Sequence, residues 1–278
     1  MKDFTFDTIM VHGGKFHADD VCCVALAKVL KPGISVIRTT TVPEDDVPET
    51  TIVCDIGRGE FDHHQTDNEV RENGIPYAAF GKMWRAFGHL LLPDEKSWEK
   101  FETTFVQPID GADNGVASNQ FSQLISEFNP SFTESKDPFS AFMEAVEFVI
   151  PLMERKIKLI KDAESCRHEV AEAVRAANGG VVVLNRFLPW QEIVVPSANK
   201  VVVFPSNRGG WNCQAVPVEL GSFETKVSLL CSGFTPEELC RVEEGMSFVH
   251  TAGFLAAFDT KEHAISFATR ICNIGGDN

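Results

Sequence analysis

Short apolar runs alternate with longer amphipathic segments in the first half of the chain. The runs at 8–11, 35–38 and 51–55 are rich in β-branched residues and have the length of buried strands. The segments at 18–30 and 78–92 repeat apolar residues at helical spacing. Short strands separated by helices are typical of a parallel sheet, so this half is predicted to form a parallel α/β domain.

The middle of the chain has a helical pattern. Apolar residues recur at three- and four-residue steps from 97 to 128 and again from 138 to 177. Pro151 falls inside the second segment and is expected to kink or split it, because proline cannot donate a backbone hydrogen bond. Asn178-Gly179-Gly180 is a typical helix stop and is predicted to end it.

The last third of the chain is dominated by strand-like runs and closes with a helix. Strands are expected at 181–184, 201–204, 211–216, 226–230 and 248–251, and the helix at 260–271. This order predicts a smaller α+β domain. We therefore expect an α/β protein with a parallel-sheet domain at 1–135, a helical connector at 136–179 and an α+β domain at 180–278.

Charge limits the partners that this chain is expected to bind. The 278 residues carry a formal net charge of −15, and the basic residues between 155 and 161 are a scattered group. A protein that grips a long polyanion usually needs a basic face. The charge therefore favours short or small phosphorylated substrates over extended duplexes.

Other bulk features favour a soluble protein. No apolar run approaches the roughly 20 residues that cross a bilayer, and the start of the chain, MKDFTFD, resembles neither a signal peptide nor a transit peptide. The eight cysteines include no CxxC pair and are predicted to be reduced thiols. We expect no membrane partner and a cytoplasmic location by default, with an organellar or nuclear location left open.

A cluster of potential metal ligands follows the first predicted strand. His12, His17 and Asp19 surround a Gly13-Gly14 turn, where positive φ angles let the three side chains converge. Imidazoles and carboxylates are ligands of divalent ions such as manganese, iron and zinc. The alternative is structural: Asp19 and Asp20 would cap the following helix, and the two histidines would be surface residues.

Two further clusters fall in the first quarter of the chain. Asp55 ends the third predicted strand, at the sheet edge where ligands of parallel α/β proteins bind. Asp62, His63 and His64 follow soon after it. Each cluster is weak evidence alone, because an aspartate at a strand end can cap a loop and Asp62 can simply orient one imidazole.

Together the clusters predict a metal-dependent hydrolase. A structural zinc needs four ligands and usually recruits cysteine, whereas six ligands are enough for two ions. Two ions about 3.5–4 Å apart can activate a water and stabilise both oxygens of a phosphoryl transfer. The six ligands would be His12, His17, Asp19, Asp55, His63 and a later aspartate.

The order of these motifs resembles that of the DHH phosphoesterase superfamily. His-x4-His-x-Asp is followed by Asp-x-Gly after a strand, then by Asp-His-His-Gln, and then by Asp-x2-Asp-Asn-Gly. Within the superfamily the chain is similar to the melanocyte-proliferating-gene (MYG) family of metal-dependent hydrolases, described as 3′-to-5′ RNA exonucleases. The likeness extends over nearly the whole chain and includes the segments 189–192, 211–217 and 248–254.

The resemblance implies a DHH-type first domain that binds two metal ions. His12, His17 and Asp55 would hold the first ion. Asp19, Asp55 and His63 would hold the second, together with one aspartate from the segment 110–115. Manganese is the ion that the resemblance implies.

The resemblance also implies roles for residues near these ligands. Asp113 lies in Asp113-Asn114-Gly115, which looks like the superfamily's Asp-Thr-Gly motif, so Asp113 is the favoured ligand and Asp110 its substitute. Asp55, His63 and His64 would be the catalytic residues. His64 would also bind the substrate by facing its phosphate.

The second domain is expected to contact the substrate. Arg208 offers a guanidinium for a phosphate and Trp211 an aromatic face for a base, with Gln214 close to them in the sequence. His250 ends a strand-like run and would reach the same cleft. The alternative is that Trp211 is a core residue and Arg208 a solvated loop residue.

One departure from the family concerns the substrate. Many relatives have Gly-Gly-His where this chain has Ala256-Ala257-Phe258, and that motif is associated with substrate binding. The leading prediction is a 3′-to-5′ exonuclease acting on RNA or short oligonucleotides. A small-molecule phosphatase for pyrophosphate, a nucleoside bisphosphate or a dinucleotide is the second hypothesis, and a non-catalytic metal-stabilised interaction protein is the third.

Overall fold

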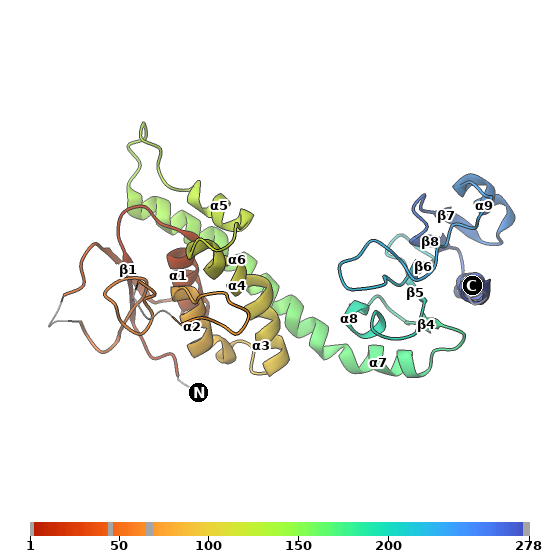
Figure 1. Ribbon diagram of the computed structural model, residues 1–278, viewed down its shortest axis with the longest axis horizontal. Helices are drawn as coiled ribbons and strands as arrows, with labels where there is room; N and C mark the ends of the chain where they lie inside the picture. The colour runs from red at the N-terminus through yellow and green to blue at the C-terminus, as the bar shows by residue number, and fades with distance from the viewer. Residues whose placement is uncertain (1–2, 44–46, 65–68, 275–278) are drawn as a thin grey trace. The chain divides into compact units, whose positions relative to one another are not determined.

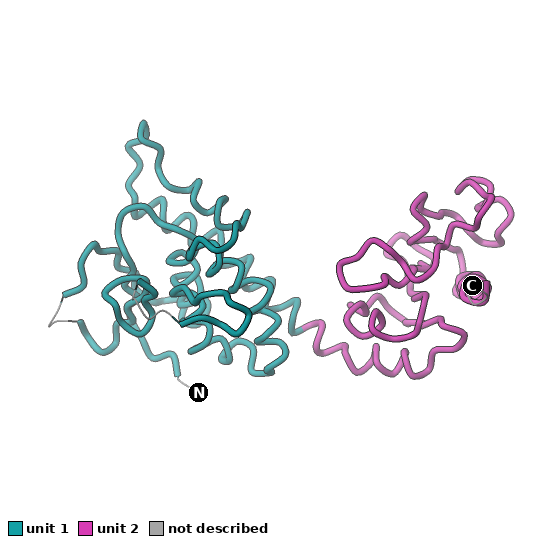
Figure 2. The backbone as a smooth tube through the Cα atoms, viewed as in Figure 1, with its two compact units in different colours: residues 1–161 teal, residues 162–278 magenta. Residues whose placement is uncertain are grey.

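The computed structural model describes residues 3–43, 47–64 and 69–274. The chain divides into two units, residues 1–161 and residues 162–278 (Figure 2). Unit 1 contains a parallel three-stranded sheet with helices, and unit 2 contains a separate mixed sheet with helices. The predicted α/β class is therefore confirmed. The division falls within the helical segment 136–179, so both units contribute residues to that segment.

A parallel sheet of three strands is the framework of unit 1 (Figure 1). Its order is β2-β1-β3, with β2 at Ser35–Thr39, β1 at Thr8–His12 and β3 at Thr51–Val53. All three strands were predicted from their β-branched runs. Because both pairings are parallel, the carboxyl ends of the strands meet at one edge of the sheet.

Two helices of unit 1 begin close to where they were predicted. Helix α1 spans Ala18–Leu30, the predicted bounds, and its residues 18–27 are all buried. A helix that carries small and mostly apolar residues on every side is typical of an element buried in the core. Helix α2 (Ala79–Phe87) contacts α1 and continues into the 3₁₀ turn η1 (Gly88–Leu90), which replaces the end of the predicted helix.

The segment predicted to be helical from 97 to 128 consists of several shorter pieces. The continuous helix ends after Asp113, where Gly115 has a positive φ of 70°. A new helix starts at Gln120, because the side chain of Asn119 accepts hydrogen bonds from the backbone N–H groups of the first turn. The pieces are α3 (Glu95–Phe101), the π-helix η2 (Glu102–Val106), α4 (Gln107–Asp113) and α5 (Gln120–Ser126).

A long helix leads out of unit 1. Helix α6 spans Pro138–Ser165 and runs through Pro151, so the predicted split at Pro151 is wrong. Pro151 lies on the exposed side of the helix, where water can hydrate the carbonyl group that loses its partner. The other side of α6 packs into the core of unit 1. The interruption comes at Cys166, before α7 (Arg167–Arg175).

Unit 2 is built on a five-stranded sheet of order β4-β5-β6-β8-β7. The pair β4 and β5 is parallel, and the other neighbours are antiparallel. The closing helix α10 packs on β4, β5, β6 and β8. The strands are β4 (Val181–Val183), β5 (Val201–Pro205), β6 (Trp211–Ala215), β7 (Met246–Val249) and β8 (Leu255–Phe258), and the helices after α7 are α8 (Gln191–Val194), α9 (Pro236–Val242) and α10 (Lys261–Ile274).

Several elements of unit 2 differ from the sequence-based expectation, and the short helices α8 and α9 were not predicted. The segment 226–230 is not a strand, because its backbone groups bond singly to different loops, with Lys226 N–H donating to Val216 and Leu229 N–H to Gly253. Strand β8 was not predicted. Its alanines have a low strand propensity, and the pairing with β6 and β7 on its two sides stabilises it.

Two findings bear on the predictions made from composition. All eight cysteines are free thiols, and none forms a disulfide. Within residues 3–43, 47–64 and 69–274, no helix is both long enough and apolar enough to cross a membrane.

Candidate metal centre

Two potential ligands lie side by side at the carboxyl edge of the parallel sheet. Met10 of β1 is opposite Val53 of β3, so two residues further along His12 comes beside Asp55. The distance from His12 Nε2 to Asp55 Oδ2 is 3.3 Å. Asp55 is buried and has a φ of 58°, a left-handed conformation that few residues other than glycine adopt. Strained backbone of this kind is concentrated at functional sites.

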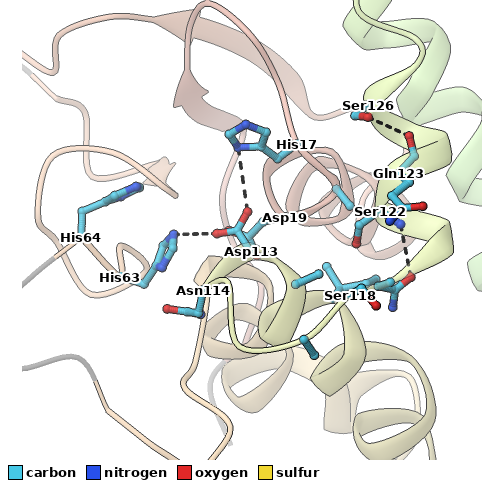
Figure 3. A pocket seen from close by; sticks show the side chains of 15 residues that line it. His17, Asp19, His63, His64, Asp113, Asn114, Ser118, Ser122, Gln123 and Ser126 are labelled. Atoms are coloured by element: carbon cyan, nitrogen blue, oxygen red, sulfur yellow. Dashed lines mark hydrogen bonds and ion pairs between the residues drawn. The ribbon is translucent and has the colours of Figure 1, made fainter.

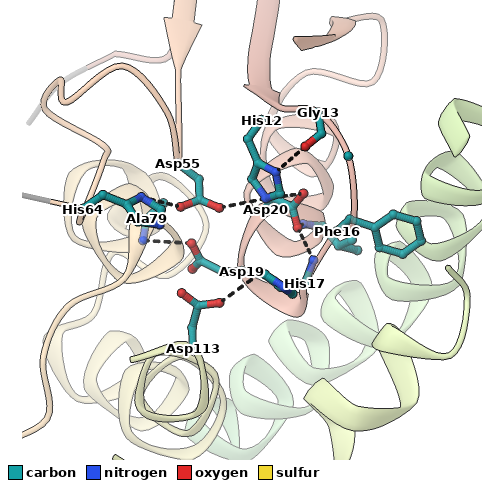
Figure 4. Close-up of polar contacts among 12 residues, drawn as sticks. His12, Gly13, Phe16, His17, Asp19, Asp20, Asp55, His64, Ala79 and Asp113 are labelled. Atoms are coloured by element: carbon teal, nitrogen blue, oxygen red, sulfur yellow. Dashed lines mark hydrogen bonds and ion pairs between the residues drawn. The ribbon is translucent and has the colours of Figure 1, made fainter. Parts of the chain in front are cut away.

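His63 belongs to two overlapping groups of potential ligands. One ligand atom from each of Asp55, His63 and His64 lies within 4.8 Å of the others, and the same holds for Asp19, His63 and Asp113. His63 Nε2 is 3.1 Å from Asp55 Oδ1 and 3.1 Å from Asp113 Oδ2. Figure 3 shows His63 directed at Asp113, and Figure 4 shows Asp55, Asp19 and Asp113 facing one region. Residues from the loop after β3, from α1 and from α4 therefore converge at one place.

Unsatisfied polar atoms test whether this place suits a metal ion. Asp20 Oδ2, Asp55 Oδ1 and His63 Nε2 are buried, and within the part of the chain that the structure describes each lies 3.1 Å from a group of opposite charge without the geometry of a hydrogen bond. Buried polar atoms almost always have a partner. Carboxylate oxygens and imidazole nitrogens are ligands that divalent manganese, iron and zinc accept. The residues present therefore fit a divalent metal ion.

Asp19 also caps a helix, but not the one that was expected. Its buried carboxylate accepts hydrogen bonds from the backbone N–H groups of Ala79, at 3.0 Å, and Phe80, at 2.8 Å. These groups start α2, whose N-cap residue Ala78 offers no side-chain cap. The backbone groups and the helix dipole stabilise the negative charge of Asp19. Asp19 is thus fixed in position from the side opposite the cluster of ligands.

Asp20 is a member of the site that the sequence did not reveal. As expected it caps α1, by accepting a hydrogen bond from the backbone N–H of His17 at 2.9 Å. Its other oxygen lies 3.1 Å from His12 Nε2 and 3.7 Å from Arg38 Nη2. Arg38 stacks on the ring of Phe142 and donates a hydrogen bond to the carbonyl of Gly14. The capping pattern in the sequence did not indicate that Asp20 also contacts His12.

His17 lies at the rim of the cluster. Its side chain is 55% exposed, and Nδ1 is 3.9 Å from Asp113 Oδ1. It belongs to neither group of converging ligand atoms among the described residues. The structure places His17 beside Asp113, and the centre of its ring lies 5.9 Å from that of His12, with which the resemblance grouped it.

Asp110 is engaged away from the cluster. Its Oδ2 accepts a hydrogen bond from Arg71 Nη2 at 2.6 Å, and its Oδ1 accepts one from the backbone N–H of Gly81 at 3.1 Å. A Cβ atom at Gly81 would lie 1.9 Å from Asp110 Oδ2, so this close approach requires glycine. The geometry thus favours Asp113 over Asp110 as the ligand from α4.

Asp62 orients His64. Asp62 Oδ1 lies 2.8 Å from His64 Nδ1, and Asp62 Oδ2 accepts a hydrogen bond from the backbone N–H of Arg58 at 2.6 Å. The buried Lys82 Nζ donates to the backbone carbonyl of Asp62 at 2.6 Å. The imidazole of His64 is 61% exposed and lies 3.6 Å from Asp55 Oδ1, so it borders both the cluster and solvent.

The charges of the cluster shift the pKa values of its imidazoles upward. Burial alone would lower the pKa of His12, but the hydrogen bond to Asp55 and the charge of Asp20 raise it to about 9. For His63, the contacts with Asp113 and Asp55 likewise outweigh burial and raise the pKa to about 11. Burial would raise the pKa of Asp55, but its two imidazole partners lower it to about 2.

The pKa values of Asp19 and Asp20 are raised, whereas the pKa of Asp55 is lowered. Burial and the nearby charges of Asp55 and Asp113 hold the pKa of Asp19 well above its usual range. Burial raises the pKa of Asp20 to about 7, although the His12 imidazole opposes this shift. A bound cation would favour the ionised form of all these carboxylates and the neutral form of the imidazoles.

A hollow of about 670 Å³ opens beside the cluster (Figure 3). His17, Asp19, His63, His64 and Asp113 form one part of its wall. The rest of the wall comes from α4, α5 and the turn between them. The predicted ligands thus line a space in which a small substrate group can lie.

The predicted substrate residues of unit 2 are split between the two faces of its sheet. Arg208, Gln214 and His250 line a second hollow of about 660 Å³, with exposed Phe248 beside them. Trp211 does not line this hollow; it packs against the core of unit 2, and Lys261 Nζ lies 5.3 Å from the centre of its ring. Successive side chains of a strand point to opposite faces, which separates Trp211 from Gln214.

Comparisons with known proteins cover almost the whole chain. The profile of a family described as an uncharacterised protein family (UPF0160, MYG1 exonuclease) matches residues 8–271. The MYG1 protein of Dictyostelium discoideum is 25% identical over 319 residues, covering 96% of each chain. The MYG1 exonucleases of Rattus norvegicus and Homo sapiens are each 25% identical, covering 94% of this chain and 83% and 84% of their own.

No solved structure matches the chain significantly. The extent of the family match is decisive, because it includes both units and every predicted ligand from His12 to Asp113. The resemblance seen in the sequence is confirmed: the chain belongs to the MYG1 exonuclease family.

Proposed function

We propose that this protein is a metal-dependent phosphodiesterase that removes nucleotides from the 3′ end of RNA or short oligonucleotides, using two divalent ions, with manganese as the expected ion. The observation that carries the proposal is the convergence of Asp19, Asp55, His63 and Asp113, with His12 beside them, on one edge of a parallel sheet. This arrangement supports the ligand set that the resemblance to DHH phosphoesterases implies, with His17 at its rim.

The positions of the side chains suggest how they would share two ions. Asp55 has one oxygen toward His12 and the other toward His63, so its carboxylate can serve both sites. Asp19 and Asp113 flank His63 on the second side. When bound, the ions would supply a nucleophile from water and positive charge for the phosphoryl oxygens.

The residues around the ligands would position the substrate. His64 is exposed beside Asp55, and Asp62 fixes its ring, so the imidazole is held where a phosphate oxygen can approach it. Asp20 holds the imidazole of His12 toward Asp55. Arg208, Gln214 and His250 of unit 2 are the candidate contacts for the remainder of the chain being degraded.

The comparisons support a nuclease activity in particular. The rat and human relatives are named exonucleases, and they align with both units of this chain. The net charge of −15 favours short substrates, because an acidic surface repels a long polyanion.

The test is a degradation assay with a 5′-labelled single-stranded RNA of about ten nucleotides and manganese. Wild-type protein should shorten the RNA in single-nucleotide steps from the 3′ end. Asp55→Asn should lose at least a hundredfold in rate, because loss of a shared carboxylate affects both ions. Asp7→Asn removes an equal charge from an exposed ion pair with Lys31 and should keep full activity.

Two outcomes would overturn the proposal. One is cleavage of pyrophosphate or a dinucleotide with no action on RNA, which would favour a small-molecule phosphatase. The other is tight manganese binding without hydrolysis of any phosphate ester, which would favour a non-catalytic protein.

A further inference from the structure

The hollow beside the metal centre has two chemically different sides. One side carries the histidines and aspartates described above. The opposite side carries neutral hydroxyl and amide groups from α5 and the turn before it, namely Ser118, Asn119, Ser122, Gln123 and Ser126 (Figure 3). Ile109, Ala112 and Ala117 add apolar surface between the two sides.

The neutral side offers no counter-charge for an anion. No lysine or arginine is among the described residues that line this hollow. Residues 65–68, which follow His64 and lie outside the described ranges, are Gln-Thr-Asp-Asn and contain no cation. A phosphate group placed near α5 would therefore have hydrogen-bond donors but no basic side chain of this wall to neutralise it.

The hydroxyl of Ser122 lacks a partner at this wall. Its Oγ lies just beneath the surface and makes no hydrogen bond within the described residues. A buried hydroxyl without a partner is unfavourable. A sugar hydroxyl or a base edge in the hollow would provide one after a rotation of the serine side chain.

We propose that this hollow is a nucleoside subsite, which receives the sugar and base next to the phosphate at the metal centre and discriminates against a second phosphate. The inference rests on the proposed function and narrows the class of substrates that the metal centre is expected to accept. Sugar hydroxyls and base edges are neutral donors and acceptors, which match serine, asparagine and glutamine side chains. Nucleoside bisphosphates and pyrophosphate carry their second charge into a wall that cannot neutralise it.

Calorimetric titration of the manganese-loaded protein tests the subsite with three probes: inorganic phosphate, uridine 5′-monophosphate and uridine 3′,5′-bisphosphate. Chromatography of the cell contents verifies that each probe stays intact. The monophosphate should bind at least tenfold more tightly than inorganic phosphate, because its nucleoside fills the hollow. The bisphosphate should bind no more tightly than the monophosphate. A tenfold preference for the bisphosphate would refute the inference.

Substitutions on α5 give a sharper test. Gln123→Lys adds a cation to the wall and should tighten binding of the bisphosphate about tenfold, while binding of the monophosphate changes less than threefold. Leu124→Lys is the matched control, since Leu124 is the next residue, is exposed and does not line this hollow. Ser122→Ala should weaken binding of the monophosphate a few fold and leave binding of inorganic phosphate unchanged. Equal behaviour of the two lysine variants would contradict the placement of the nucleoside.

The failure of this inference differs from the failure of the proposed function. RNA degradation by a protein that prefers the bisphosphate would refute the subsite and keep the exonuclease. The predicted binding order without any hydrolysis of RNA would keep the subsite and refute the exonuclease.

Discussion

Replacement of Arg71 by methionine should strongly destabilise unit 1. The side chain of Arg71 is 6% exposed, and its guanidinium lies 2.6 Å from both Glu102 Oε1 and Asp110 Oδ2, which are themselves buried. Removal of one partner of a buried ion pair typically costs about 3–5 kcal/mol, because a charge remains without compensation. Two carboxylates share this guanidinium, so we expect a loss in the upper part of that range.

Protonation should set an upper limit to this loss. Burial raises the pKa of Asp110 to about 6 even though Arg71 opposes the shift. Without Arg71 the folded-state pKa rises further above that of the unfolded chain. The folded variant then binds a proton more readily than the unfolded one, so its stability should increase as the pH falls from 8 toward 5.

Scanning calorimetry of the full chain measures the effect. For a unit of about 160 residues, 1 kcal/mol corresponds to about 2–4 °C, so the transition of unit 1 should fall by roughly 6–20 °C. Arg85→Met is the matched control, since Arg85 also stacks on Tyr77 and contacts Glu69 at 2.6 Å, but its side chain is 45% exposed. An exposed pair contributes about 0–1 kcal/mol. A loss for Arg71→Met no larger than for Arg85→Met would refute the reasoning.

Three other perturbations have defined outcomes. Gly81→Ala should destabilise unit 1 by more than about 2 kcal/mol in urea denaturation, because its Cβ would lie 1.9 Å from Asp110 Oδ2; an unchanged midpoint would contradict the tight packing. Lys226→Met should cost unit 2 about 1–3 kcal/mol, since Nζ donates to the carbonyls of Val195 and Ser197, and a neutral effect would mean that water replaces these bonds. Manganese binding should release at least two protons at pH 7, because the pKa values of His12 and His63 are raised to about 9 and 11 and ligation needs neutral imidazoles. The affinity should therefore rise with pH, while the metal-free protein loses stability as the pH rises through 9; titrations in buffers of different ionisation enthalpy count the protons, and a release near zero would exclude both imidazoles as ligands.

The sequence was most informative where a local pattern determines geometry. β-branched runs and helical spacing identified the parallel sheet and α1, because short strands that alternate with helices are typical of a parallel α/β domain. The neighbouring positions of His12 and Asp55 follow from parallel pairing alone, since the carboxyl ends of such strands meet. The position of the His17 side chain does not follow from strand pairing, because this exposed side chain is not constrained by the sheet.

Contacts between distant segments could not be predicted in this way. The helical pattern does not distinguish Asp110 from Asp113. In the structure Asp110 differs by its ion pair with Arg71, which lies 39 residues away along the chain. The capping of α2 by Asp19 spans 60 residues. Strand β8 depends on two partners rather than on its own alanines. Each of these features depends on tertiary packing that no window of sequence contains.

The left-handed backbone at Asp55 has a consequence for protein engineering. Glycine adopts such a φ without penalty, so Asp55→Gly should relieve conformational strain, but it should also leave the imidazoles of His12 and His63 without the carboxylate that raises their pKa values. A selection for heat resistance alone would thus weigh a relaxed backbone against two imidazoles that have lost a counter-charge. Thermostable library members from this family therefore need an activity screen in parallel, since a glycine tolerated at this position would remove the carboxylate shared by both proposed ions.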